Sequence, residues 1–259
     1  MNNLLLIIDM QNDFCHPDGA LYVNGAEDDV ARLGTFIFDN EERFDHIIMT
    51  QDNHHVIDIS HPGFWEDQNG NPPLPFTTIN SETVQNGAWR PRFHKEEAAV
   101  YIQNLEKQGE FPHVVWPEHC IIGSCGAAIV NEIMEPVRSW AGKGHYFDVV
   151  VKGTNPLTEH FGALMANVPI EGSPETQLNN ELVRKLMLYD KILIAGEAKS
   201  HCVATTIKQL LNFEGFAPRL VILEDCMSDV TGFETLALPI YEKAKNDGST
   251  FTLSTIWFR

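Results

Sequence analysis

A single cysteine, Cys202, lies where a buried strand is expected to give way to a helix. The apolar run 191–196 predicts the strand, because it is short, rich in Ile and Leu, and ends at a glycine. The segment 201–211 predicts the helix. Backbone N–H groups at a helix N-terminus favour negative charge and lower the pKa of a cysteine there. We therefore expect Cys202 to be a thiolate nucleophile, the alternative being a small core residue.

Four further polar residues follow expected strands: Asp9, Asp52, Lys152 and, after a very short strand at 113–116, His119. Taken singly, an aspartate after a strand is a common cap or turn residue, and a lone lysine usually points to solvent. In a parallel sheet, however, the carboxyl ends of the strands share one edge, and ligands bind there. An acid, a cation and a thiol at one edge are the groups that nucleophilic catalysis requires.

The elements that must position these groups alternate along the chain. The strands lack polar alternation, which is typical of strands buried on both faces of a parallel sheet. This pattern predicts an α/β fold, a three-layer doubly wound sandwich around a mostly parallel six-stranded sheet. The expected strands of the sheet are 4–8, 46–52, 147–153, 191–196, 219–225 and 251–254. The expected helices are 27–42, 94–110, 126–140, one capped by Ser173 with Pro174 in its first turn, 201–211 and 233–246.

One region interrupts the alternation. From 53 to 91 the chain is rich in Pro, Gly, Asn and aromatic residues, and the helix expected at 94–110 follows it. A loop of this length inside a compact domain usually has a function. We expect residues 1–259 to form a single domain in which residues 61–110 are an insertion that acts as a lid or pocket wall.

Composition bounds the class of protein. The chain has 259 residues, of which 43% are hydrophobic, so one compact domain with a large core is expected. A net charge of -18 argues against a nucleic acid partner, because phosphate binding needs clustered Lys and Arg. The apolar run near the N-terminus is too short for a signal peptide or a membrane span. The five cysteines are odd in number and form no CxxC pair, so a reducing cytoplasm is expected.

Five motifs together resemble the isochorismatase-like cysteine hydrolases and, within them, the nicotinamidases. They occur in the family's order and span most of the chain apart from residues 61–110. Each motif alone is weak, and the combination is specific. The motifs are Ile8-Asp9-Met-Gln-Asn-Asp-Phe14, Thr50-Gln-Asp52-Asn-His54, Trp116-Pro-Glu-His119-Cys120, Val151-Lys152-Gly153-Thr154 and Gly196-Glu-Ala198-Lys-Ser-His-Cys202-Val203.

The resemblance implies a catalytic triad of Asp9, Lys152 and Cys202. Asp9 would take the thiol proton, and Lys152 would stabilise both Asp9 and the thiolate by its opposite charge. A thioester would form, release ammonia and be hydrolysed. The family also implies a cis peptide before Ala198, so that the N–H groups of Ala198 and Cys202 form an oxyanion hole. Loss of one such donor costs about 3 kcal/mol of transition-state stabilisation.

The resemblance also implies a metal site formed by Asp52, His54 and His119. Alternating residues of an extended segment point to the same side, so Asp52 and His54 can share one ion that His119 completes. In nicotinamidases the matching residues bind Zn²⁺, or a similar divalent ion such as Mn²⁺ or Fe²⁺, which holds the pyridine nitrogen of the substrate; no organic cofactor is implied. The alternative is that both histidines are hydrogen-bonded loop residues.

The chain departs from the family at several positions. Asn53-His54-His55 stands where Trp-His-Pro is common, and Lys199-Ser200 stands where Thr-Asp is common. The inserted His61 and His94 are extra ligands, lid residues or neither. Phe14 and Trp116 are expected as ring-stacking walls of the substrate site, with a place in the core as the alternative. These departures leave the triad intact and leave the substrate open.

Three functions compete. The first is a metal-assisted amidase that releases ammonia from nicotinamide or a similar small-molecule amide, as in NAD salvage. The second is an isochorismatase-type or N-carbamoyl hydrolase of the same fold, which ordinarily lacks the metal motifs. The third is a non-catalytic relative that uses the insertion as an interface. On family grounds a homo-oligomer is expected, without nucleic acid or membrane partners.

Overall fold

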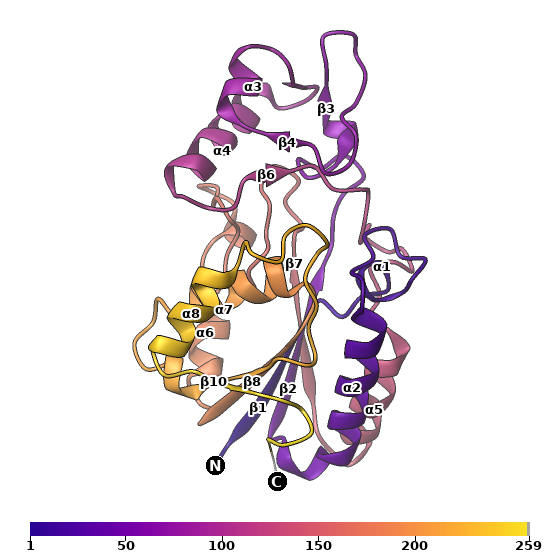
Figure 1. Cartoon of the computed structure of the whole chain (residues 1–259), viewed down its shortest axis with the longest axis vertical. Coiled ribbons are helices and arrows are strands. Elements are labelled where there is room, and N and C mark those ends of the chain that lie inside the picture. Colours follow the sequence, from indigo (N-terminus) through magenta and orange to yellow (C-terminus); the bar gives the residue numbers. More distant parts are fainter. Residues whose placement is uncertain (258–259) are drawn as a thin grey trace.

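The computed structural model describes residues 1–257 and consists of three layers around one all-parallel sheet (Figure 1). Six strands form this sheet in the order β10–β9–β8–β1–β2–β7. Their bounds are β1 Asn3–Ile8, β2 His46–Asp52, β7 Phe147–Lys152, β8 Lys191–Gly196, β9 Leu220–Leu223 and β10 Thr250–Thr252. The predicted α/β sandwich with a six-stranded sheet is confirmed.

Helices cover both faces of the sheet (Figure 1). One face carries α2 and α5, and the other carries α6, α7 and α8. Strand β1 is fully buried from Leu4 to Ile8 because it lies in the middle of the sheet between these layers. The helix bounds are α1 Asn12–Cys15, α2 Ala26–Asp39, α5 Asn131–Gly142, α6 Asn180–Leu186, α7 Ala204–Leu210 and α8 Leu238–Asn246.

The helix expected to begin at Ser173 begins later. Pro174–Thr176 forms only a single 3-10 turn, and the side chain of Ser173 caps nothing. Helix α6 is capped instead by Asn179, whose side chain accepts a hydrogen bond of 2.9 Å from the N–H of Leu182. Asparagine is as strong an N-cap as serine, and the helix starts at this later cap.

Two other helices are shorter than predicted at their N-termini. In the expected helix 126–140, the backbone before α5 bonds to another segment: the N–H of Val130 donates to the carbonyl of Met10. This backbone is therefore engaged in tertiary contacts rather than in a helix. In the expected helix 233–246, Pro239 lies in the first turn of α8, the one part of a helix that tolerates proline.

The insertion, residues 61–110, lies beyond the carboxyl ends of the central strands (Figure 1). It contains β3 Trp65–Glu66, β4 Thr78–Ile79, α3 Ser81–Gln85, β5 Arg90–Pro91 and α4 Lys95–Lys107. Strand β3 pairs with β5, and β4 pairs with β6 (His113–Val114) outside the insertion. A second apolar core fills it, formed by Ile59, Phe64, Trp65, Ile79, Ala98, Tyr101, Ile102, Leu105, Val115 and Val168.

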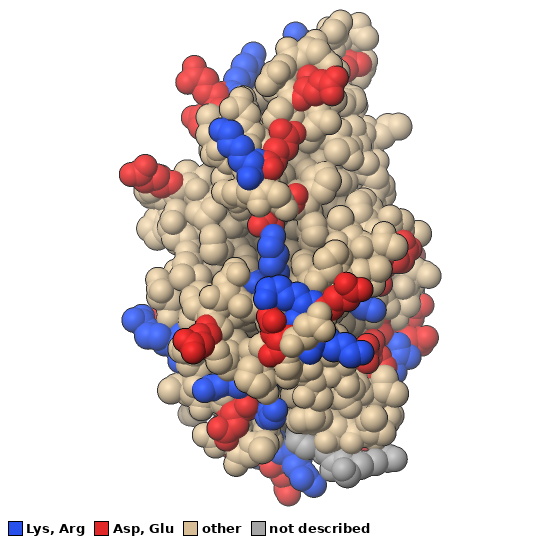
Figure 2. Space-filling model, turned by 60° about the vertical axis from the view of Figure 1, so that its left-hand side comes forward, with Lys and Arg blue, Asp and Glu red and all other residues tan. Residues whose placement is uncertain are grey.

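The described helices include none that is both long and apolar enough to cross a bilayer. Lys and Arg side chains are interspersed with Asp and Glu side chains on the face shown in Figure 2.

Candidate catalytic and metal site

Four neighbouring strands deliver the polar residues singled out in the sequence. In the sheet, β8, β1, β2 and β7 lie side by side. Asp9 directly follows β1, Asp52 ends β2, Lys152 ends β7, and Cys202 follows β8 after a short turn. Asp52 and Lys152 are register partners across the β2–β7 pair. Parallel pairing therefore brings these four side chains to one edge of the sheet.

Lys152 is the hub of the site. Its Nζ lies 2.9 Å from Asp9 Oδ2, 3.1 Å from Asp52 Oδ1 and 3.7 Å from Cys202 Sγ. It also donates a hydrogen bond of 2.9 Å to the carbonyl of His160. Burial acts to lower the pKa of Lys152, yet the two carboxylates outweigh burial and hold the pKa well above its usual value. The lysine is therefore a permanent cation beside the thiol.

Burial sets the protonation of the other two triad residues. It raises the pKa of Asp9, and Lys152 opposes this shift. Burial also raises the pKa of the Cys202 thiol well above its usual value, with Asp9 adding to the effect as a hydrogen-bond partner of the thiol. Burial and Lys152 thus act on the pKa of this thiol in opposite directions, and burial has the larger effect. The neutral thiol lies beside a carboxylate that can accept its proton.

The turn that carries Cys202 has an unusual backbone. The peptide bond between Glu197 and Ala198 is cis, as the family resemblance implied, and a π-helical turn, Lys199–Val203, follows it. Among the described residues, no group accepts the N–H of Ala198. Before this turn, Gly196 has a φ of +132°, and a Cβ there would lie 2.0 Å from the carbonyl oxygen of Ile8. Only glycine allows β8 to pass this close to β1.

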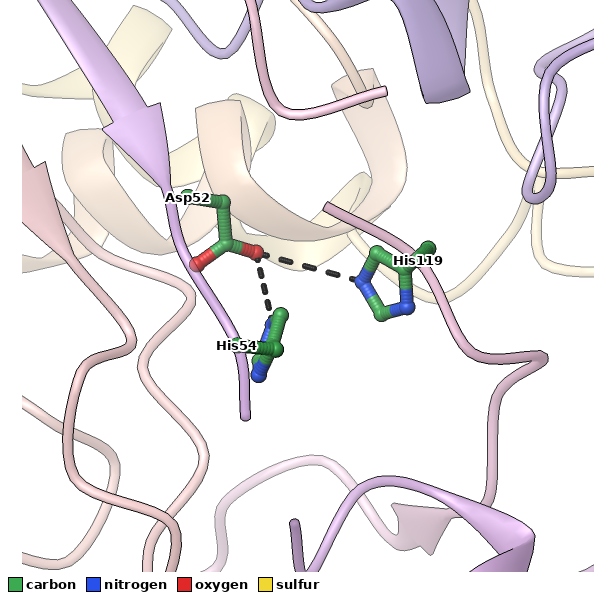
Figure 3. Close-up of side chains that lie close together, drawn as sticks. All are labelled: Asp52, His54 and His119. Atoms are coloured by element: carbon green, nitrogen blue, oxygen red, sulfur yellow. Dashed lines mark hydrogen bonds and ion pairs between the residues drawn. The ribbon is translucent and has the colours of Figure 1, made fainter. Parts of the chain in front are cut away.

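Asp52, His54 and His119 form a buried cluster (Figure 3). Each offers one ligand atom, and the three atoms lie within 4.8 Å of one another. Asp52 Oδ2 is 3.0 Å from His54 Nε2 and 4.0 Å from His119 Nε2. One carboxylate and two imidazoles around a common point are a donor set for a divalent ion of the Zn²⁺, Mn²⁺ or Fe²⁺ type.

Hydrogen bonds to the second ring nitrogen prepare both histidines as ligands. Asp58 Oδ2 lies 3.2 Å from His54 Nδ1, and the carbonyl of Pro117 lies 2.9 Å from His119 Nδ1. Each contact favours a proton on Nδ1, and Nε2 is the ring atom that each histidine directs toward Asp52. Burial lowers the pKa of His119 well below its usual value, which keeps this ring neutral. The residues present therefore fit a metal ion.

The charge around His54 differs from that around His119. Burial acts to lower the pKa of His54, but Asp52 and Asp58 outweigh it and raise the pKa well above its usual value. Burial likewise acts to raise the pKa of Asp52, while His54 and Lys152 bring it below its usual range. The carboxylate of Asp52 is thus ionised, and it pairs with Lys152 through Oδ1 and with the two imidazoles through Oδ2.

One cavity is lined both by Cys202 and by two residues of the candidate metal cluster, Asp52 and His119. Its accessible volume is about 30 Å³, enough for one or two waters, so an aromatic ring enters only when side chains of the wall move. Phe14 and Trp116 line it as expected, and the ring of Phe14 lies 5.4 Å from that of His119. The complete wall is Phe14, Leu21, Asp52, Trp116, His119, Glu159, Phe161, Ala198, His201, Cys202 and Val230.

The two inserted histidines take different places. His61 is buried, and its Nε2 lies 3.3 Å from His119 Nδ1, so it packs behind a metal ligand. His94 is exposed at the start of α4 and forms no part of the cavity wall.

Several site residues escaped the sequence analysis. Phe161 and His201 form the aromatic wall with Trp116, with ring centroids of His201 and Trp116 5.1 Å apart. Asp58 holds His54, and Glu159 adds a carboxyl to the cavity. The proximity of Asp58 to His54 in sequence could have signalled its role. Nothing in the sequence marks Glu159, which lies in an irregular loop after β7.

Comparisons with known proteins found nicotinamidases among the similar sequences and solved structures. No protein-family model matches the chain. The curated nicotinamidase of Saccharomyces cerevisiae is 24% identical over 202 residues, which are 78% of each chain. The structure of an Acinetobacter nicotinamidase/pyrazinamidase superposes with a TM-score of 0.66 at 21% identity, covering 98% of this chain and 97% of the other.

One of the similar solved structures contains zinc. The pyrazinamidase of Pyrococcus horikoshii, in complex with zinc, has a TM-score of 0.57 to this chain at 19% identity and covers 98% of this chain and 99% of its own. These solved structures share the three-layer fold, and the curated relatives share sequence over about four fifths of the chain. The chain is thus similar in sequence to curated nicotinamidases over about four fifths of its length, and it shares the fold of solved nicotinamidase structures.

Proposed function

We propose that this protein is a metal-assisted cysteine amidohydrolase that converts nicotinamide and water to nicotinate and ammonia. The observation that carries the proposal is the contact of Lys152 Nζ with both Asp9 and Cys202, of which Cys202 lines the cavity. On the same cavity, Asp52 and His119 belong to the candidate metal cluster. A nucleophile, a base, a cation and a ligand set for an ion thus meet where a small amide would bind.

In the proposed mechanism, Cys202 Sγ attacks the carboxamide carbon while Asp9 accepts the thiol proton. The carbonyl oxygen becomes an oxyanion and accepts hydrogen bonds from the N–H groups of Ala198 and Cys202. Collapse of this intermediate breaks the C–N bond, and Asp9 returns its proton to the departing ammonia. Asp9 then takes a proton from water, which attacks the thioester and releases the acid and the thiol.

Asp52, His54 and His119 would hold the divalent ion, whose chemistry is to bind the ring nitrogen and so orient the carboxamide toward Cys202. Phe14 and Trp116 would flank the ring. The named zinc complex of the Pyrococcus pyrazinamidase supports zinc as the first ion to test. We also propose a role in NAD salvage in a reducing cytoplasm, which the five free cysteines support. A homo-oligomer stays a prediction.

The test measures ammonia release from nicotinamide and pyrazinamide by the metal-loaded and the chelator-treated enzyme. Turnover is expected only with metal. Cys202→Ala is expected to lower kcat by at least ~10³-fold and to retain substrate binding, because it removes the nucleophile alone. The exposed Cys125→Ala is the matched control and is expected to keep full activity. Failure to release ammonia from nicotinamide at any metal loading contradicts the proposal.

A further inference from the structure

A pair of buried acids adjoins the turn that carries Ala198. Glu197, which directly precedes Ala198, is fully buried, and Asp29 of α2 is only 2% exposed. Neither acid lines the cavity, and the proposed mechanism uses neither of them. Two buried carboxyl groups are costly unless hydrogen bonds and a shared proton compensate them. The contacts of the pair therefore indicate what it holds in place.

These contacts favour one proton on Glu197 and a negative charge on Asp29. Asp29 Oδ1 accepts a hydrogen bond of 2.7 Å from the guanidinium group of Arg32. Glu197 Oε1 is buried, and no group in the described part of the chain donates a hydrogen bond to it. Burial and the charge of Asp29 raise the pKa of Glu197 well above its usual value, and the protonated carboxyl is hydrogen-bonded to Asp29. At neutral pH, Glu197 is thus a neutral donor.

Ser228 joins both acids to the turn. Its N–H donates to Glu197 Oε2 at 3.2 Å, and its hydroxyl donates to Asp29 Oδ2. Its carbonyl accepts a hydrogen bond of 2.8 Å from the N–H of Lys199. Ser228 therefore holds the residue before Ala198 and the residue after it.

The place of Ala198 matters because of its own N–H group. Ala198 lines the cavity together with Cys202, and no described group accepts its N–H. A donor to an oxyanion must be in position before the reaction, and a displacement of about 1 Å can cost ~100-fold in rate. Glu197 is bonded covalently to the nitrogen of this N–H group, so the hydrogen bonds of its side chain act directly on the donor.

Resting on the proposed function, we propose that Glu197 is a positioning residue that holds the N–H of Ala198 where the oxyanion of the reaction forms. Its carboxyl group does so through its hydrogen bonds with Asp29 and Ser228. Because the N–H acts on the transition state more than on the bound amide, loss of these bonds lowers kcat and leaves KM nearly unchanged. Glutamine can donate to Asp29 and accept from Ser228 in place of glutamate, whereas leucine can do neither.

The experiment measures kcat and KM for ammonia release from nicotinamide by the metal-loaded enzyme. Glu197→Leu is expected to lower kcat by ~10- to 100-fold with little change in KM. Glu197→Gln is expected to keep most of the activity, because it keeps both hydrogen bonds. The exposed Glu171→Leu is the matched control and is expected to leave both constants as they are.

Amide hydrogen exchange in residues 196–203, measured without substrate, tests the same contacts independently of the reaction. Exchange is expected to be faster in Glu197→Leu than in the unsubstituted protein and unchanged in Glu197→Gln. If the unsubstituted protein releases no ammonia, the proposed function fails, and equal exchange in the leucine variant and the unsubstituted protein is then the result that overturns the role of Glu197.

Three kinetic results overturn the proposal: an unchanged kcat in Glu197→Leu, a KM in that variant that rises as much as kcat falls, and a glutamine variant as impaired as the leucine variant. If Glu197→Leu does not fold, Asp29→Ala replaces it, because this substitution removes the acceptor of the same proton. An unchanged kcat in the Asp29 variant overturns the proposal as well.

Discussion

At the scale of the residue, Lys152 couples two halves of the site that have different tasks. Its ammonium group contacts the base Asp9 on one side and the ligand Asp52 on the other. Breaking a buried ion pair by removing one partner leaves an uncompensated charge, which is strongly destabilising. A substitution of Lys152 would therefore affect both Asp9 and Asp52. A substitution of a residue that contacts only a candidate metal ligand can change the metal site alone.

Asp58 is such a residue, because it contacts His54 and not the cavity. Its Oδ1 accepts hydrogen bonds from the N–H and the hydroxyl of Ser60, which fix the carboxyl behind the imidazole. Asp58→Asn is expected to weaken zinc binding by ~10- to 100-fold, since the orientation and basicity of His54 depend on this contact. Competition with a chromophoric chelator measures the affinity. The exposed Asp18→Asn is the control, and equal affinities in the two variants contradict the assigned role.

At the scale of the element, the end of β7 is shaped to admit the carboxylate of Asp52. Gly153 follows β7 with a φ of +76°, and a Cβ there would lie 2.4 Å from Asp52 Oδ1. Gly144, before β7, has a φ of +101° with nothing within 4 Å of its Cβ position. Both glycines have a positive φ, but only Gly153 has a neighbouring atom, Asp52 Oδ1, at the position that a Cβ would occupy.

This pair gives a matched test of the strand end. Gly144→Ala is expected to cost only the backbone strain, ~1–2 kcal/mol of unfolding free energy. Gly153→Ala is expected to cost more and also to displace Asp52, weakening zinc binding by at least ~10-fold. Urea unfolding and chelator competition measure the two effects. Equal losses of stability and of zinc affinity in both variants would contradict a role for the close approach of Gly153 to Asp52.

The insertion is the second element with a task, because it holds the segment that carries Trp116 and His119. Strand β4 pairs with β6, and the N–H of Val115 donates to the carbonyl of Thr77 at 2.9 Å. We propose that residues 61–110 act as a wall that positions this segment. Their own core, and not the central sheet, must then keep the wall rigid.

Removal of the largest side chain of that core tests the wall. Trp65 is fully buried, so Trp65→Ala is expected to cost ~3–5 kcal/mol of local stability and to raise KM more than it lowers kcat. Amide hydrogen exchange should become faster in residues 61–119, while β1 and β8 stay protected. Val100→Ala, on the exposed side of α4, is the control. Unchanged exchange in the Trp65 variant contradicts the proposed role.

At the scale of the whole molecule, buried neutral histidines make the fold sensitive to acid. Burial lowers the pKa of His113 and of His201 to about 4 and that of His160 to about 3. In the unfolded chain these rings bind protons near their usual pKa of 6.5. Unfolding therefore takes up protons, and the stability present above pH 6.5 is lost as the pH falls toward 4.

A substitution of His113 tests this acid sensitivity at one buried histidine. Its Nε2 lies 2.9 Å from the carbonyl of Ile59, a bond that glutamine can replace. In His113→Gln, the loss of stability between pH 6.5 and about 4 is expected to be shallower by at most about 1.4 kcal/mol per pH unit. Urea unfolding at several pH values measures the slope. The exposed His16→Gln should leave the slope as it is, and a His113 variant with the same slope contradicts the assignment.

The central strands could be predicted from the sequence because their apolar runs need no partner to be identified. His46–Asp52 and Lys191–Gly196 agree with the expected ranges to the residue, and Phe147–Lys152 ends one residue before its expected range does. The starts of α5 and α6 could not be predicted, because the competing partners of the backbone, such as Met10 for Val130, are remote in sequence. The same holds for the thiol of Cys202, whose pKa depends on burial that no local pattern encodes.

By itself, the sequence determined the order of strands and helices, and with it the edge at which Asp9, Asp52, Lys152 and Cys202 would meet. Their types and their places after apolar runs are local properties, and parallel pairing does the rest. Only the tertiary structure decided that Asp58 holds His54, that Glu159 lines the cavity, and that burial raises the pKa of the Cys202 thiol. These facts depend on which atoms lose water and which find partners, and both are set by segments far apart in the chain.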